Sequence, residues 1–324
     1  MSSEMSSAAG GAAVEQRRRR FEVRNLGIVL AFVALFVALS VATDTFLTQR
    51  NLLNILDQSA PLGIIACAVT VCIIAGIFDL STGAIFAVSA VVATKVANSA
   101  DPSVGLLAGV LAGLGLGIVN GVLVHYTRIN SFIGTLATSI VYRGIAILVT
   151  GGAIVTVTDE AFSKPGTEEL LQAKYSVWVF AAFFAFTAFL LARTTFGRYV
   201  YAVGGNDEAA RLSGIRVGLI RGACFALSGF AAGVAGVLAA SRTSSAQADL
   251  GMGLELSAIA AAVVGGTSIL GGEGAVWRGV LGVLTLAIIG NGFDLLSVDT
   301  TYQQLVQGVL ILLAVAVDQL VRRR

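Results

Sequence analysis

The residues of this chain that could do chemistry are few, and one group of them interrupts an apolar stretch. Residues 76–83 read Gly-Ile-Phe-Asp-Leu-Ser-Thr-Gly, so a carboxylate, two hydroxyl groups and two glycines fall between apolar segments. Broken helices of this kind expose backbone groups that bind polar solutes in membrane proteins. A turn in which Asp79 caps the following helix would need no solute. The sequence leaves both interpretations of Asp79 and Ser81 open.

Polar side chains also occur within or at the edges of later apolar segments: Asn120, Arg143, Glu255, Asn291 and Asp294. Charged groups inside a bilayer are costly and usually face the interior of a helix bundle or a pore. We therefore expect Arg143 to have a carboxylate or carbonyl partner. Asn120 and Asn291 are each followed by glycine in predicted spans of opposite direction, which is a faint sign of an inverted repeat. Both asparagines are candidates for a solute path.

The combinations of residues that enzymes use are not found. The lysines, Lys95, Lys164 and Lys174, each follow a residue other than glycine, so the Gly-Lys pair of a phosphate-binding loop is missing. With the single histidine His125, neither a metal cluster of the usual spacing nor a histidine-assisted nucleophile can be assembled. We predict no catalytic residue, no metal site and no cofactor in this chain. ATP and magnesium would have to be bound by a partner protein.

The composition indicates whether water or lipid surrounds most of the chain. Of 324 residues, 56% are hydrophobic and 12% are charged, and the mean hydropathy is +0.87. Soluble proteins carry about 25% charged residues and about 45–50% apolar ones. The net charge of +2 gives no bias toward nucleic acid. The chain is therefore predicted to be an all-α, polytopic membrane helix bundle in contact with lipid.

Each membrane span needs about 20 predominantly apolar residues, so the apolar content allows about ten spans. The basic cluster 17–20 before the first apolar run would also fit a cleaved signal peptide, but the run is longer than a usual signal core. With the N-terminus inside, fifteen basic residues fall inside and five outside, so both termini are predicted to be cytoplasmic. The predicted spans are 26–42, 60–78, 83–98, 104–125, 131–150, 177–193, 219–240, 255–270, 279–296 and 303–320.

The segments outside the spans give the predicted organisation. Residues 1–25 form a disordered, basic cytoplasmic N-terminus, residues 26–321 the transmembrane domain, and residues 322–324 a basic cytoplasmic tail. Within the domain, the long loop 151–176 is predicted to be extracytoplasmic and the long loop 194–218 cytoplasmic.

The cytoplasmic loop contains a short predicted helix. Asn206 is a good N-cap, the helix would extend to Leu212, and Gly214 is a good stop. Small Ala209 and its charged neighbours suit a helix that docks into a groove of another protein. A solvated basic loop that only holds the orientation is the alternative.

Four glycines are spaced by four residues through one predicted span. Gly109, Gly113, Gly117 and Gly121 would therefore lie along one helix face. Absent side chains on such a face let a neighbouring helix approach closely. The pattern predicts helix packing rather than contact with a solute.

From residue 26 onward, the chain resembles the permease subunits of ribose-type ABC importers. The loop motif at 204–215 (GGNDEAARLSGI) is among the most specific parts of the resemblance, together with those at 79–83, 120–124 and 131–136. The other matching motifs are 79–83 (DLSTG), 120–124 (NGVLV), 131–136 (SFIGTL), 264–272 (VGGTSILGG) and 314–318 (AVAVD). Phe132, in the motif that opens a predicted span, joins Asp79, Ser81, Asn120 and Asn291 as a candidate for the solute path.

The resemblance implies a multi-pass protein of the cell inner membrane that imports a sugar or a similar small polar solute. It implies a dimer with a second permease, identical or similar, a cytoplasmic ATP-binding subunit, and an extracytoplasmic solute-binding protein. It further implies that the 204–215 segment contacts the ATPase. The residues carried over to that contact are Gly205, Asn206, Glu208, Ala209, Arg211, Ser213 and Gly214.

Two other classes of protein compete with this interpretation. A secondary transporter driven by an ion gradient would need an ion site within the membrane, for which Asp79 and Glu255 are candidates. A membrane-embedded enzyme would need a nucleophile with its base or a metal constellation, and the sequence supplies neither.

Overall fold

The computed structural model describes residues 28–299, 302, 305–306 and 308–309. In this part of the chain, seven helices are long and apolar enough to cross a membrane, and the prediction of a helical membrane protein is confirmed. They are α2 (Gln49–Ile74), α3 (Thr82–Ser99), α4 (Pro102–Thr127), α5 (Ser131–Thr150), α7 (Tyr175–Arg193), α10 (Val217–Thr243) and α12 (Val276–Leu295).

Shorter elements connect these helices. Two further apolar helices have fewer than 18 described residues: Ile28–Ala42, which starts at the first described residue, and α11 (Leu254–Val264). Three further helices are α6 (Glu160–Thr167), α8 (Thr195–Gly205) and α9 (Asp207–Leu212). Two antiparallel pairs of very short strands complete the fold, β1 (Val155–Thr156) with β4 (Ser245–Ala246) and β2 (Glu169–Leu170) with β3 (Ala173–Lys174).

The helix boundaries differ from two predicted spans. The span predicted at 60–78 overlaps the second half of α2, which ends at Ile74. Helix α2 begins at Gln49, because the Thr48 hydroxyl caps it by accepting from the Asn51 backbone N–H. The span predicted at 255–270 is α11, which ends at Val264 and is followed by Gly266 at φ +82°. A helix of 11 residues rises about 16 Å, roughly half of the hydrocarbon core.

The described residues therefore give seven helices of spanning length and two shorter apolar ones, where ten spans were predicted. The tenth predicted span, 303–320, lies mostly outside the described residues. The predicted N-terminal segment 1–25 and the tail 322–324 lie outside them entirely.

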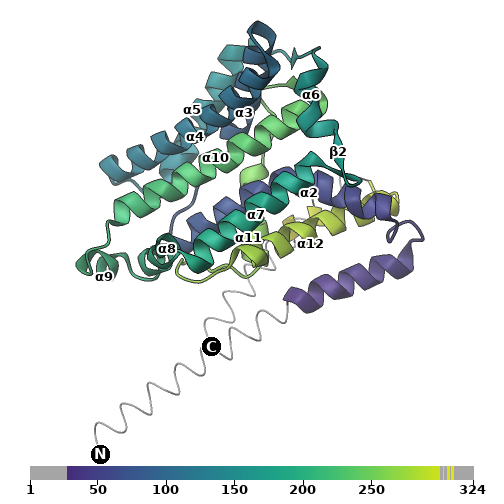
Figure 1. Cartoon of the computed structure of the whole chain (residues 1–324). Coiled ribbons are helices and arrows are strands. Elements are labelled where there is room, and N and C mark those ends of the chain that lie inside the picture. The colour runs from purple at the N-terminus through teal and green to yellow at the C-terminus, as the bar shows by residue number, and fades with distance from the viewer. Residues whose placement is uncertain (1–27, 300–301, 303–304, 307, 310–324) are drawn as a thin grey trace, which may run out of the picture.

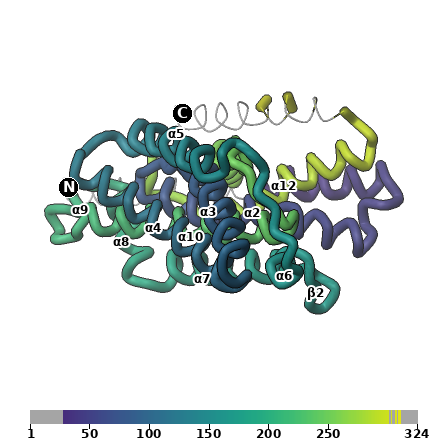
Figure 2. Tube along the Cα trace, turned by 90° about the horizontal axis from the view of Figure 1, so that it is seen from above, coloured from purple at the N-terminus to yellow at the C-terminus, as the bar shows by residue number. Residues whose placement is uncertain are grey.

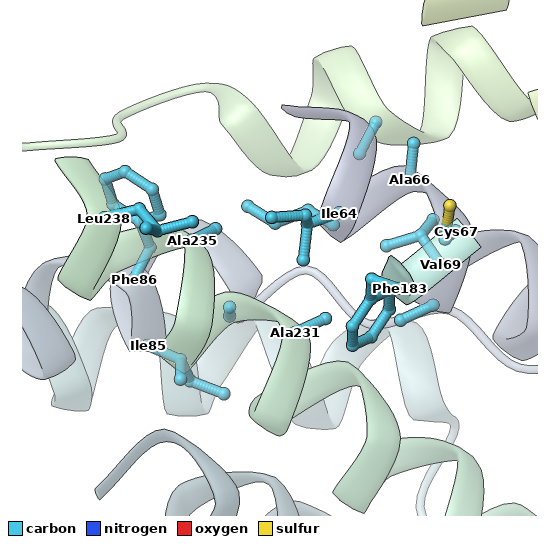
Figure 3. Packing of buried hydrophobic residues seen from close by; sticks show 14 of the residues in the cluster. Ile64, Ala66, Cys67, Val69, Ile85, Phe86, Phe183, Ala231, Ala235 and Leu238 are labelled. Carbon is cyan, nitrogen blue, oxygen red and sulfur yellow. The ribbon is translucent and has the colours of Figure 1, made fainter. Parts of the chain in front are cut away.

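Helix α2 forms the centre of the bundle. It packs against α7, α10, α11 and α12, and every residue from Gly63 to Ile74 is buried. A helix that is apolar all round belongs in a protein interior. Figure 3 shows Ile64 and Val69 of α2 facing Phe183 of α7 and Ala231 of α10. Helix α2 forms one layer with α7, α11 and α12, and α3, α4, α5 and α10 form the second layer (Figure 1).

The short elements of the two long connecting segments, 151–176 and 194–218, lie at opposite ends of the bundle. Helices α8 and α9 occupy one end, and α6 and β2 occupy the other (Figures 1 and 2). We call these the α9 end and the α6 end. The segment 194–218 contains α8 in addition to the one short helix predicted there. Thr194 caps the start of α8, since its hydroxyl accepts from the Gly197 backbone N–H.

Three of the evenly spaced glycines of α4, Gly113, Gly117 and Gly121, face α10, and Gly109 lies between α3 and α10. A β-carbon on Gly113 would lie 2.5 Å from the Cα of Gly233, and one on Gly117 would lie 2.4 Å from the carbonyl oxygen of Phe225. Ordinary van der Waals contact begins at 3.4 Å. The two helix backbones are thus in direct contact, the arrangement that small residues permit in membranes.

We expect Gly113→Ala to lower stability by about 1–3 kcal/mol, the usual cost of overpacking a well-packed core. Gly115 is the matched control: it lies in the same helix, but a β-carbon there would meet nothing within 4 Å. Gly115→Ala should be neutral or stabilise by up to about 1 kcal/mol through helix propensity. The measurement is the apparent melting temperature of the purified protein in detergent. Equal melting temperatures for the two variants would contradict the packing argument.

Candidate functional site

The break between α2 and α3 is organised by Asp79. The backbone N–H and the hydroxyl group of Ser81 both donate to Asp79 Oδ1, at 3.0 and 2.5 Å. Both side chains are fully buried. The aspartate therefore closes a turn directly before α3, in the manner of an Asx motif at a helix start.

Two other helices extend this turn into a network. Asn120 of α4 donates from Nδ2 to Ser81 Oγ at 2.7 Å. Tyr142 of α5 donates from its hydroxyl group to Asn120 Oδ1 at 2.9 Å. Asn120 is fully buried and Tyr142 is 4% exposed. The chain Asp79–Ser81–Asn120–Tyr142, which we call the buried network, thus connects the break to α4 and α5.

The start of α5 also serves the backbone of the break. The Phe78 N–H donates to Ser131 Oγ at 3.2 Å, and the Leu80 N–H donates to Thr135 Oγ1 at 3.0 Å. These two hydroxyl groups satisfy backbone donors that no longer belong to a helix, which irregular backbone at membrane depth requires.

The structure brings three of the five predicted solute-path residues together and separates the other two. Asp79, Ser81 and Asn120 share the buried network. Phe132 is 47% exposed at the start of α5, and its ring centroid lies 6.4 Å from that of Phe78. Asn291 lies on α12 and exchanges two hydrogen bonds with Asn51 of α2, at 2.8 and 3.0 Å.

Asn291 lines a groove between α2 and α12, which has a volume of about 260 Å³. Gln58 and Ser59 contribute polar groups from α2, and Asp294 contributes one from α12. The apolar lining is Ile55, Leu62, Leu286, Ala287, Ile289 and Phe293. Apolar walls with a few polar groups are the usual lining of a small-molecule site.

A second, wider pocket of about 610 Å³ lies at the α6 end. It is lined by Gln49, Arg50, Leu53, Asn54, Asp57, Glu169, Gln172 and Lys174. Asp57 is 3% exposed and accepts from Ser176 Oγ at 2.5 Å. Lys174 Nζ lies 3.0 Å and Arg242 Nη1 3.5 Å from Asp57 Oδ2. This cluster holds α2 and α10 to the start of α7.

Sequence reasoning missed the Asp57 cluster, because its members are far apart along the chain and each is ordinary by itself. It did predict the kind of partner that Arg143 has. Arg143 Nη1 donates to the carbonyl oxygens of Ala248 and Leu250, at 2.7 and 2.9 Å. The arginine thereby holds the segment that connects β4 to α11.

At the α9 end, a charged helix is presented to solvent. Asn206 caps α9 as predicted, accepting from the Ala209 backbone N–H at 2.9 Å. Arg211 pairs with Glu208, and its hydrogen bond and positive charge lower the pKa of the Glu208 carboxyl group. Arg221 of α10 lies 3.2 Å from Asp207 and ties α9 to the bundle.

All seven residues predicted to contact an ATPase are exposed at this end: Gly205, Asn206, Glu208, Ala209, Arg211, Ser213 and Gly214. Leu212, which the sequence analysis did not select, is 77% exposed. The sequence contains one indication of Leu212: it is an apolar residue at the end of a short helix that is otherwise charged or small. Among the residues that the structure describes, no group of three or more His, Cys, Asp or Glu side chains could hold a metal ion.

Comparison with known proteins finds close relatives. The model of the family described as branched-chain amino acid transport system / permease component matches residues 51–315. The chain is 40% identical to the L-arabinose ABC transporter permease protein AraH of Azospirillum brasilense, over 92% of this chain and 88% of that protein. It is 37% identical to the ribose import permease protein RbsC of Escherichia coli (strain K12), over 90% of this chain and 92% of that protein. No solved structure shows a significant match.

We expect Asn120→Leu to destabilise the fold by about 1–3 kcal/mol, because a buried polar group that loses its partner keeps its desolvation cost. Asn120 serves Ser81 and Tyr142 together, so its loss breaks the buried network in two places. Tyr142→Phe removes one end of the network and should cost about 1 kcal/mol. Apparent melting temperatures in detergent measure both. Tyr126→Phe, at a position that is 78% exposed, is the control; if Asn120→Leu were no more harmful than this control, the network would not hold the break together.

Proposed function

This chain belongs to the branched-chain amino acid transport system / permease component family, and from that premise we propose that it is the membrane-spanning subunit of an ABC importer for a sugar. The family membership covers most of the chain and carries the proposal. The relatives named above are permeases for arabinose and ribose. Both sugars are pentoses, so a pentose is the solute class that we propose first.

The energy for transport is proposed to come from a separate ATPase subunit that contacts α9 from the cytoplasm. The exposed Glu208, Ala209, Arg211 and Leu212 form a compact surface of charged and apolar groups on this helix. A short helix with such a surface fits into a groove of a partner protein. With the α9 end in the cytoplasm, the α6 end faces the extracytoplasmic solute-binding protein, and both termini are cytoplasmic.

The mechanism that we propose is alternating access in a dimer of this chain with itself or with a similar permease. The protein makes and breaks no covalent bond. ATP binding and hydrolysis in the partner would favour one of two bundle conformations, because a ligand shifts an equilibrium by its differential affinity for the two states. The groove between α2 and α12 is proposed to contribute to the solute path through Asn291, while the buried network maintains the break at the other end of α2.

The test of this function is uptake into proteoliposomes. The complete importer, assembled from this chain, its ATPase subunit and its solute-binding protein, should take up D-ribose or L-arabinose when ATP is present. This chain alone should take up neither sugar under a proton or sodium gradient. Gradient-driven uptake without the ATPase would overturn the proposal in favour of a secondary transporter.

We expect Glu208→Arg to reduce the stimulation of ATP hydrolysis by solute-loaded binding protein at least fivefold in the assembled importer. The substitution reverses the charge at the proposed contact and breaks the pair with Arg211, while Glu208 is exposed and the spans stay folded. Arg128→Glu is the control, a charge reversal in the exposed turn after α4. Equal stimulation of ATP hydrolysis in the two variants would show that α9 is not part of the contact with the ATPase subunit.

For the groove, we expect Asn291→Ala to lower sugar uptake at least fivefold and leave basal ATP hydrolysis within twofold of the parent. Asn51→Ala breaks the same reciprocal pair of hydrogen bonds, but Asn51 does not line the groove. It should lower uptake less than twofold. The same loss of uptake in both variants would show that the pair acts on packing and that Asn291 does not meet the solute.

A further inference from the structure

Three segments that are far apart in sequence meet backbone to backbone at the α9 end. They are the end of α2, the end of α8, and the loop between α11 and α12. The Gly272 N–H donates to the carbonyl oxygen of Ile74 at 2.9 Å. Gly76, Gly204, Gly271 and Gly272 surround this hydrogen bond, and we call these four residues the glycine joint.

The contacts at three residues of the glycine joint, Gly204, Gly271 and Gly272, leave no room for side chains. A β-carbon on Gly204 would lie 1.7 Å from the Ile74 carbonyl oxygen and 2.7 Å from the Gly272 nitrogen. One on Gly271 would lie 2.8 Å from the Gly204 carbonyl oxygen and 3.0 Å from the Cα of Gly76. Gly76, Gly271 and Gly272 also have positive φ, at +73°, +84° and +73°, a conformation that glycine adopts at no steric cost.

Backbone contact of this kind transmits movement. Flexible side chains between two elements can change rotamer and absorb a displacement, whereas close-packed backbone has low compressibility and passes the displacement on. A second connection reinforces the first. Tyr201 of α8 donates from its hydroxyl group to the carbonyl oxygen of Gly274 at 2.8 Å, two residues before α12 begins at Val276.

The elements that the glycine joint connects are the ones that the transport cycle needs to couple. Gly204 is two residues before Asn206, the N-cap of α9. Ile74 is the last residue of α2, and the 271–274 loop leads directly into α12. Helices α2 and α12 are the two walls of the groove that contains Asn291. The glycine joint thus connects the proposed ATPase-binding helix α9, through the end of α8, to both walls of the proposed solute groove.

We propose that the glycine joint is the mechanical connection that converts a displacement of α9 into a change in the separation of α2 and α12. Gly204 and Tyr201 are its positioning residues on the α8 side, and Ile74, Gly272 and Gly274 are the backbone points on which they act. This inference rests on the proposed function, since it assigns the route by which the ATPase partner moves the solute path.

Gly204→Ala tests the joint in the complete importer reconstituted in proteoliposomes. Its β-carbon would separate α8 from α2, so we expect uptake of D-ribose or L-arabinose to fall at least tenfold. Gly222→Ala is the matched control, a glycine near the start of α10 where a β-carbon would meet nothing within 4 Å. It should transport within twofold of the parent.

A distance measurement separates coupling from simple loss of stability. Spin labels on Gln58→Cys and Asp294→Cys, two exposed positions on opposite walls of the groove, report the separation of α2 and α12. The distance should change when ATP and vanadate are added to the parent and to Gly222→Ala, and it should not change in Gly204→Ala. A distance change in Gly204→Ala equal to that of the parent would overturn the proposal that the glycine joint couples α9 to α2 and α12.

Tyr201→Phe gives a second, milder test that introduces no steric clash. It removes the hydrogen bond to Gly274 and should lower the sugar taken up per ATP hydrolysed at least threefold. If Gly204→Ala does not fold, an unchanged ratio in Tyr201→Phe overturns the inference. If the parent importer shows no ATP-dependent uptake, the proposed function fails. If the parent transports and Gly204→Ala transports equally well, the inference about the glycine joint is wrong and the proposed function stands.

Discussion

The fold depends on how the chain satisfies the backbone groups set free where α2 stops and α3 begins. In lipid, an unpaired N–H or C=O group cannot form a hydrogen bond with water, so irregular backbone must form its hydrogen bonds within the protein. Here the N–H groups of Phe78 and Leu80 donate to hydroxyl groups of α5, and that of Ser81 donates to Asp79. The Ile74 carbonyl accepts from Gly272, on a loop far along the chain. The break is thus what ties α2, α3, α5 and the α11–α12 loop into one structure.

The sequence indicated the break and three of the four residues of the buried network, as candidates for a solute path, but neither Tyr142 nor the partners of the break on α5. Asp79 and Asn120 stand out because carboxylate and amide groups are rare in apolar segments, and Ser81 is noticed only because it lies in the interrupted segment beside Asp79. Their partners on α5 do not stand out, since a hydroxyl group in a span usually bonds to its own helix. Thr135 does this too, donating to the Ser131 carbonyl at 2.8 Å, while it also accepts from Leu80. A local pattern cannot reveal that second role.

The errors in the predicted elements have equally physical causes. The start of α2 was predicted too late because Gln49, Asn54 and Asp57 lower the hydropathy of its first turns. These polar residues are accommodated at the α6 end, where Asp57 has two cationic partners and Gln49 bonds to Gln172. Helix α8 was missed because it contains three glycines, Gly197, Gly204 and Gly205, which disfavour a helix on propensity. Tertiary contacts override that propensity: Gly197 and Gly204 lie against backbone oxygens of α7 and α2.

The two kinds of helix contact in this bundle suggest where movement occurs. Helices α4 and α10 touch through the backbones of Gly113, Gly117, Gly229 and Gly233, and a displacement there would meet hard contacts within a fraction of an ångström. Helices α2 and α12 contact each other along part of their length, where Gly279 lies against Thr70. Farther along, they border a partly polar groove, beside which Asn291 pairs with Asn51. Hydrogen bonds between amide side chains can be exchanged for bonds to water or a solute at little net cost. A bundle that alternates between two conformations would therefore keep the α4–α10 contact and open between α2 and α12, the pair that the glycine joint connects to α9.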